Sequence, residues 1–98
     1  MKPIVLHCET NVELTAIAKR YACERPELAR DFLHSYRAAM EAIEQQPDRF
    51  SFLEEPVRRA RIAGFPYRIV YEELVEGIHV LAVMHDSREP GYWKSRLI

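Results

Sequence analysis

The sequence has few cysteines and no long hydrophobic run, and each shortage excludes a class of protein. Its two cysteines, Cys8 and Cys23, do not lie in a C-x-x-C spacing, and a chain so poor in cysteine is typical of a reducing compartment. The apolar run from Ile4 to Leu6 is too short for the core of a signal peptide or for a membrane span. We therefore expect a cytoplasmic protein with no membrane partner, in which both cysteines are buried packing residues.

Signatures of common enzyme chemistry are also absent from the sequence. It contains no glycine-rich phosphate loop, no G-x-S-x-G elbow and no Ser/His/Asp grouping at a recognisable spacing. Metal-binding residues tend to come at short, regular spacings, whereas the four histidines are scattered: His7, His34, His79 and His85. We therefore expect no metal site and no cofactor, and we expect His85 to cap the end of a strand.

The net charge is close to zero, but its distribution along the chain is uneven. A formal charge of -1 over 98 residues gives no general attraction to nucleic acid or to anionic membranes. Between Glu55 and Glu72, however, the chain carries no acidic residue and four arginines: Arg58, Arg59, Arg61 and Arg68. The sequence therefore predicts a local basic face on a nearly neutral protein of one domain, residues 1–98.

The first half of the chain predicts a strand followed by two helices. The apolar residues 4–8 indicate a short strand, and Asn11 is a good N-cap for a helix that ends shortly before Pro26, which cannot continue it. Pro26 suits the first turn of a second helix, in which apolar residues recur with a helical period from Ala29 to Ile43 until Pro47. Two adjacent amphipathic helices predict an α-hairpin packed on an apolar surface.

The second half supplies that surface as strands. Segments rich in β-branched and aromatic residues predict three antiparallel strands at 57–62, 67–72 and 78–85. The last segment is apolar on both faces, as expected for a central strand. Pro90 and Gly91 predict a turn, followed by a short helix or a tail. The predicted fold class is α+β, in the order β-α-α-β-β-β, with the α-hairpin on one face of the sheet and a groove on the other.

Several short motifs follow one another in the second half. They are a lead-in at Phe65-Pro66-Tyr67-Arg68, the pair Val70-Tyr71, the strand from Ile78 to His85, then Arg88 and Tyr92-Trp93. In their order and spacing they resemble the ParE/RelE toxin superfamily, the toxins of bacterial type II toxin-antitoxin systems of the plasmid stabilisation type. The resemblance covers nearly the whole chain and implies a small, twisted antiparallel sheet that carries an α-hairpin.

The same resemblance implies partners. A toxin of this superfamily is held inactive in a hetero-oligomer by a cognate antitoxin, of the ParD or RelB type, whose gene lies next to its own. The implied target is either DNA gyrase, as for ParE-like toxins, or mRNA on the ribosome, as for RelE-like endoribonucleases.

The RelE-like branch implies a set of catalytic residues. There, basic side chains grip the scissile phosphate and a C-terminal tyrosine helps to activate the attacking 2′-hydroxyl, which implies Arg61, Arg68, Arg88 and Tyr92 here. Cations held around a phosphate stabilise the charge of a transition state, so this chemistry is coherent. However, Arg59 and Arg61 stand where that branch prefers lysines, and arginine is a poor proton donor or acceptor.

Alternatively, the same side chains contact an antitoxin or a target without catalysis, or are simply solvated. The candidate binding residues are then Arg58, Arg59, Arg61, Arg68, Arg88, Tyr92 and Trp93. We expect Trp93 to pack in the core, whereas Tyr92 suits packing and binding equally, because its ring is apolar and its tip is polar.

Three hypotheses for the function follow. The first is a ParE-like toxin that binds DNA gyrase and has no catalytic activity of its own, which the Phe-Pro-Tyr lead-in, the missing lysines and the HDSREPGYW ending favour. The second is a RelE-like, ribosome-dependent mRNA endoribonuclease. The third is a non-toxic module that only binds the antitoxin.

Overall fold

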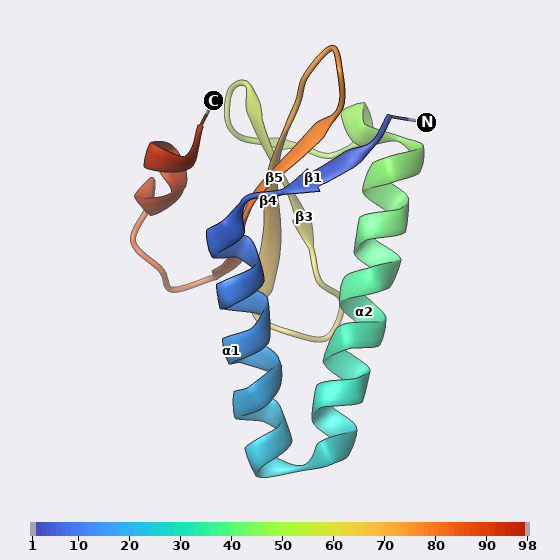
Figure 1. Ribbon diagram of the computed structural model, residues 1–98, viewed down its shortest axis with the longest axis vertical. Coiled ribbons are helices and arrows are strands. Elements are labelled where there is room, and N and C mark those ends of the chain that lie inside the picture. The colour runs from blue at the N-terminus through green and yellow to red at the C-terminus, as the bar shows by residue number, and fades with distance from the viewer. Residues whose placement is uncertain (1, 98) are drawn as a thin grey trace.

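The computed structural model describes residues 2–97. Figure 1 shows two long helices side by side, with the strands of a sheet next to them. The elements in chain order are β1 (Ile4–Leu6), α1 (Cys8–Glu24), α2 (Pro26–Gln45), the 3₁₀ helix η1 (Pro47–Arg49), β2 (Phe52–Glu54), β3 (Val57–Arg61), β4 (Tyr67–Glu73), β5 (Ile78–His85) and the 3₁₀ helix η2 (Tyr92–Arg96). The predicted α+β class is confirmed.

Helix α1 begins earlier than the sequence pattern indicated. Its N-cap is His7, whose ring Nδ1 accepts a hydrogen bond from the backbone N–H of Glu9 at 3.1 Å. The predicted N-cap, Asn11, lies inside the helix and is exposed. The prediction was wrong because a histidine ring nitrogen satisfies a free N–H group of the first turn as an asparagine side chain does.

A single extended residue, Arg25, separates α1 from α2. Pro26 occupies the first turn of α2, where its missing N–H is not needed, and a proline disfavours a helical backbone at the residue before it. The predicted break between the two helices is therefore confirmed. Phe32 and Tyr36 of α2 and Ile17 of α1 are buried in the core that these helices form with the sheet.

The sheet has the strand order β1-β5-β4-β3-β2. Strands β3, β4 and β5 form the predicted antiparallel meander, and β2 pairs antiparallel with β3. Strand β1 pairs parallel with β5, from Ile4↔Ile78 to Leu6↔Val80, so the sheet is mixed. The buried backbone groups of β5 need partners on both sides, and β1 supplies the second set. Strand β2 was missed because three residues are too few to show a period of two.

The main hydrophobic core lies between the helices and the sheet. Four aromatic rings meet there, with centroids 5.2 to 6.4 Å apart: Tyr21, Phe32, Phe65 and Tyr67. Most of these pairs meet edge to face, a geometry that adds to the stabilisation from buried area. Phe32 is 0% exposed at the centre of the group. This cluster joins both helices to the beginning of β4.

The opposite face of the sheet carries a smaller core, which the C-terminal segment covers. Its buried members are Val57, Val70, Leu81, Ala82, Met84 and Trp93. Leu81 reaches this face because it is the extra residue of a bulge in β5, where Val70 pairs with Ala82 but Tyr71 pairs with Val80. The predicted groove on this face is therefore partly filled by η2.

The two cysteines do not lie in the core. Cys8 and Cys23 are both free thiols and both exposed, so the prediction that they are buried was wrong. Helix α1 buries only Thr10 and Ile17, and its other small side chains remain at least partly at the surface.

Candidate functional site

Three arginines form a row on the face of the sheet opposite the helices. Arg61 of β3 lies directly across from Arg68 of β4, which lies across from Met84 of β5. Residues opposite one another on neighbouring strands share a face, and Met84 belongs to the smaller core on the far side from the helices. Arg59, two residues before Arg61, shares this face. We call Arg59, Arg61 and Arg68 the arginine face.

In the described part of the chain, one carboxylate forms ion pairs with the arginine face. Asp86, just after β5, pairs with two of the three arginines, its carboxylate lying 3.2 Å from Nε of Arg68 and 3.8 Å from a terminal nitrogen of Arg61. Two of the three guanidinium groups therefore share Asp86, no ion pair among residues 2–97 involves Arg59, and the face keeps an excess of positive charge. Beside it lies an open hollow of about 350 Å³ that is lined by Phe50, Ser51 and the three arginines. The sequence analysis missed Asp86. Its position directly after the last predicted strand was the signal that could have identified it.

Arg58 does not belong to the arginine face. It lies across from Tyr71, which is part of the core under the helices, so its side chain starts on the other side of β3. Its guanidinium donates to the carbonyl of Phe50 at 2.6 Å and lies over the Phe52 ring, 4.0 Å from the centroid. These contacts fix the chain where it enters β2. They also place Arg58 apart from the other arginines that were predicted to bind a partner with it.

Trp93 is a packing residue, as predicted. It is only 2% exposed in the smaller core, and its indole Nε1–H has no hydrogen-bond partner among the described residues. Gly91, which precedes η2, has a φ of 83°, a left-handed conformation that favours glycine and turns the chain back over the sheet. A hollow of about 550 Å³ lies between this turn and the sheet, bordered by Arg68, Asp86 and Arg88.

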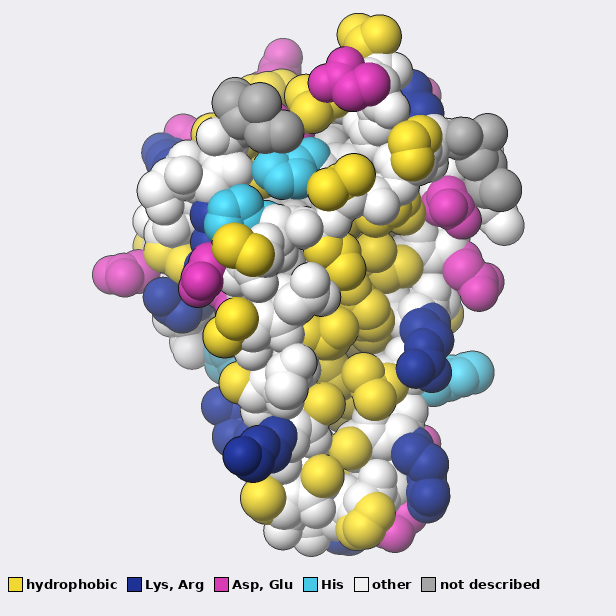
Figure 2. Space-filling view, viewed as in Figure 1, with side chains coloured by type: hydrophobic (Ala, Val, Ile, Leu, Met, Phe, Trp, Pro, Cys, Tyr) yellow, Lys and Arg dark blue, Asp and Glu magenta, His cyan; other side chains and the backbone are white. Residues whose placement is uncertain are grey.

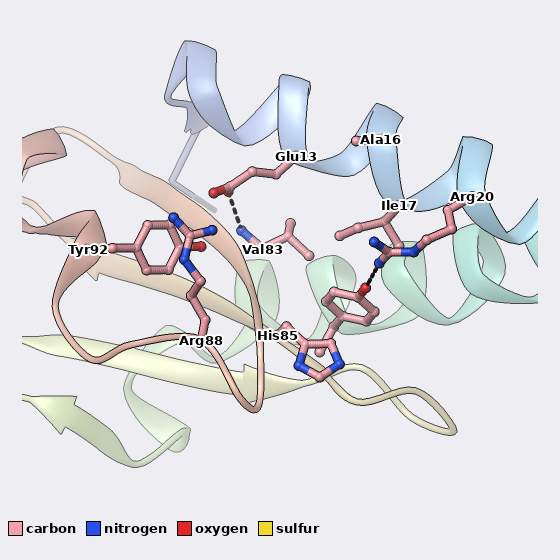
Figure 3. Close-up of a pocket in the computed structure, with 9 residues that line it drawn as sticks. Glu13, Ala16, Ile17, Arg20, Val83, His85, Arg88 and Tyr92 are labelled. Atoms are coloured by element: carbon pink, nitrogen blue, oxygen red, sulfur yellow. Dashed lines mark hydrogen bonds between the residues drawn. The ribbon is translucent and has the colours of Figure 1, made fainter.

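A second pocket lies between α1, the end of β5 and the segment after it, and Figure 3 shows its walls. We call it the α1 pocket; it has a volume of about 230 Å³, and its lining includes Ala16, Ile17, Arg20, His85, Arg88 and Tyr92. The Arg88 guanidinium lies over the Tyr92 ring, 3.9 Å from the centroid. Arg20 donates to the hydroxyl of Tyr67.

Glu13 anchors one end of the α1 pocket. Its carboxylate accepts the backbone N–H of Val83 at 3.1 Å (Figure 3). The same carboxylate lies 3.0 Å from the guanidinium of Arg96. Tyr92 packs beside this carboxylate, and burial together with the charge of Glu13 raises the pKa of its hydroxyl well above the ordinary value. The Tyr92 hydroxyl therefore stays protonated at neutral pH. The sequence contained no local signal for the Glu13–Arg96 pair, because its members lie at opposite ends of the chain.

The structure divides the four residues of the hypothetical ribonuclease site between two places. Arg61 and Arg68 meet on the arginine face around Asp86. Arg88 and Tyr92 stack on each other in the α1 pocket, although Arg88 also borders the hollow next to Arg68. His85 ends β5 as predicted, and its Nδ1 accepts the backbone N–H of Ser87 at 3.0 Å.

A third surface is apolar. Figure 2 shows hydrophobic side chains gathered along the channel between α1 and α2, with Lys and Arg at its borders. The half-buried residues that the two helices pack against the core include Leu14, Leu33, Ala39 and Met40. Such a strip fits the apolar side of an amphipathic partner segment.

Residues 2–97 contain no group of three His, Cys, Asp or Glu side chains that could hold a metal ion. None of the helices in this range is long and apolar enough to cross a membrane.

The described chain is thus a small α+β protein in which an α-hairpin covers one face of a mixed sheet and arginines line the other. The family model for the ParE toxin of the type II toxin-antitoxin system parDE matches residues 4–90. The chain therefore belongs to the ParE toxin family. Helix η2, with Tyr92 and Trp93, lies beyond the matched residues.

Solved structures share the fold. A chain described as "Chromosomal ParDE TA system from P. aeruginosa" is similar with a TM-score of 0.75, and the match covers 87% of this chain and 96% of that one. The two sequences are 16% identical, so the likeness concerns the fold alone. No curated protein matches the sequence.

Proposed function

We propose that this chain is the toxin of a type II toxin-antitoxin pair, that it stops growth by binding DNA gyrase without catalysis of its own, and that a cognate antitoxin neutralises it. Membership of the ParE toxin family supports the class of protein. One observation carries the choice of binding over catalysis: the four candidate catalytic side chains are divided between the arginine face and the α1 pocket.

The chemistry of these side chains also favours binding. A general base works best when its pKa lies near the operating pH, whereas burial and Glu13 raise the pKa of Tyr92 far above it. Arginine stays charged and exchanges protons poorly, and Arg61 and Arg68 already contact Asp86. The four candidate side chains can hold an anionic partner by charge, but none of them is a proton acceptor for a 2′-hydroxyl at neutral pH.

The arginine face and the apolar channel are the surfaces that we assign to partners. The arginine face suits an acidic surface, because it carries an excess of guanidinium groups over carboxylates, and a guanidinium group is able to form short, bidentate hydrogen bonds with a carboxylate. The apolar channel suits an amphipathic helix or an extended segment of the antitoxin. A hetero-oligomer in which the antitoxin covers both would withhold the toxin from its target.

Controlled expression in a bacterial host tests the proposal. We expect growth arrest with abnormal supercoiling or cleavage of plasmid DNA, seen on chloroquine agarose gels, while transcripts stay intact in primer-extension assays. Fragmented transcripts with normal plasmid topology would replace the gyrase proposal with the RelE-like endoribonuclease. Unaffected growth at every expression level would replace it with the non-toxic module.

Two sets of variants sharpen this test. Arg61→Ala with Arg68→Ala should abolish growth arrest, whereas Arg30→Ala with Arg37→Ala, which removes exposed arginines of α2, should retain it. Arg68→Ala with Tyr92→Phe separates the hypotheses further, since it would abolish mRNA cleavage by the RelE-like route.

The neighbouring open reading frame tests the antitoxin. We expect it to encode a short acidic or ribbon-helix-helix protein that forms a complex with this chain and restores growth when both are expressed. A neighbour that neither binds the chain nor rescues growth would contradict the proposed pairing.

A further inference from the structure

The α1 pocket is a cationic site of its own, and its two arginines form no ion pair with any residue that the structure describes. Within residues 2–97, ion pairs occupy Arg61, Arg68 and Arg96, whereas none involves Arg20 or Arg88. Arg20 donates only to a neutral hydroxyl, and Arg88 lies over an aromatic ring. In Figure 3 these two side chains lie at opposite ends of the pocket, with the aliphatic floor between them.

We propose that the α1 pocket binds an acidic segment of a partner polypeptide, which places an apolar side chain on the floor and carboxylates on Arg20 and Arg88. The floor between the arginines is formed by Ile17 and Val83. Charge-assisted hydrogen bonds from arginine to a carboxylate are short and strong, and a flanking apolar contact excludes water from them. The assignment of this segment to the antitoxin rests on the proposed function.

The size of the pocket fits side chains better than a free small ligand. Its volume of about 230 Å³ is below the roughly 300–1,000 Å³ of typical small-molecule sites. One apolar side chain with a neighbouring carboxylate fills such a space.

The edge of β5 determines whether the partner segment binds as an added strand or through its side chains. β1 pairs with only the first three residues of β5, so the later residues have no strand neighbour on that side. Side chains take the neighbour's place: Arg96 donates to the carbonyl of Leu81 at 3.0 Å, and Glu13 accepts the N–H of Val83. Because these edge groups are already paired, the partner binds here through its side chains and not as an added strand.

The charges in the wall favour a peptide over nucleic acid. The pocket offers two separate guanidinium groups, Arg20 and Arg88, instead of a continuous row of cations, and Glu13 adds a carboxylate to the lining, so the pocket matches two isolated carboxylates better than a chain of phosphates. The arginine face has the denser positive charge, with three guanidinium groups around one hollow, and is the better site for a polyanion.

A titration of the ¹⁵N-labelled full chain by NMR tests the proposal with defined probes. We expect the tripeptide acetyl-Glu-Leu-Glu-amide to shift the amide signals of His85, Arg88 and Tyr92. Its neutral twin, acetyl-Gln-Leu-Gln-amide, should bind at least about tenfold more weakly, because it lacks the charge-assisted hydrogen bonds. Equal affinity for the acidic and the neutral tripeptide, or chemical-shift changes centred on the arginine face, would overturn the proposal.

Substitutions in the pocket, compared with a control substitution on α2, distinguish a loss of binding from a loss of folding. Arg20→Gln with Arg88→Gln should weaken binding roughly tenfold or more, whereas Arg37→Gln on α2 should leave it unchanged. Ala16→Trp, at an exposed position of α1 in the pocket wall, should block the pocket with both arginines in place. Uridine monophosphate is the competing probe, and tighter binding of this nucleotide in the α1 pocket would assign the site to nucleic acid instead.

The outcome also separates this inference from the proposed function. Tripeptide binding by a chain that proves non-toxic would support the pocket and overturn the toxin assignment. Gyrase-directed toxicity and antitoxin neutralisation without tripeptide binding would overturn the pocket alone.

Discussion

The two faces of the sheet differ in what their residues do. Toward the helices, aromatic side chains such as Phe32 and Tyr67 pack edge to face and are almost completely buried. On the other face, a buried apolar group around Trp93 occupies one part, and three arginines with Asp86 occupy the rest. The first face stabilises the fold, whereas the second also leaves positive charge for a partner.

This difference predicts on which face a substitution should affect stability and on which face it should affect binding. Dry aromatic packing contributes several kcal/mol per side chain, whereas an ion pair at the surface contributes about 1 kcal/mol or less. A protein that binds other macromolecules can therefore vary its exposed face at little cost to folding.

The largest expected effect is on the aromatic face. Phe32→Ala should lower the free energy of unfolding by about 3–5 kcal/mol, because it leaves a cavity among three other rings. Arg68→Ala, the matched change on the arginine face, should cost about 1 kcal/mol or less. Urea denaturation followed by circular dichroism measures both, and similar losses for the two variants would refute the division between the faces.

The next effect is an alkaline loss of stability through Tyr71 under the helices. Burial raises the pKa of Tyr71 from 10.0 to about 12. The folded state therefore holds this proton more tightly than the unfolded state, so its contribution is complete below pH 10 and is lost as the pH rises toward 12. The loss should reach about 2–3 kcal/mol at the upper end. Tyr71→Phe, which also removes the hydrogen bond to the Pro47 carbonyl, should flatten this part of the profile.

A smaller effect is expected where the two ends of the chain meet. Glu13→Gln should lower the free energy of unfolding by about 1–3 kcal/mol, because the partly buried Arg96 loses its ionised partner. It should also lower the pKa of Tyr92, which Glu13 helps to raise. Absorbance titration of the phenolate monitors the second effect, and Glu41→Gln, an exposed position of α2, is the control. An unchanged Tyr92 titration would show that Glu13 does not act on that hydroxyl.

The smallest effect on stability is expected on the arginine face. Asp86→Asn should change the free energy of unfolding by about 1 kcal/mol or less, since its pairs with Arg61 and Arg68 are partly solvated. Among residues 2–97, Asp86 is the one carboxylate paired with the arginine face, so the same change should tighten binding of an acidic partner. Calorimetric titration with the antitoxin measures that affinity, and weaker binding would mean that Asp86 positions the arginines.

The sequence by itself determined the elements whose signals are local. Pro26 ended one helix and began the next, and the apolar run of β5 marked a central strand, because proline chemistry and side-chain periodicity act within a few residues. The family resemblance also came from motifs that are contiguous in the chain.

Only the tertiary structure decided which of the marked residues act together. Arg58 and Arg59 are neighbours in sequence, yet they start on opposite faces of β3, and the register with β4 decided which of them joins Arg68. The parallel pairing of β1, the contacts of Asp86 and the Glu13–Arg96 pair likewise join distant segments. Such contacts depend on strand register and on the path of the C-terminal segment, and no pattern within a few residues encodes them.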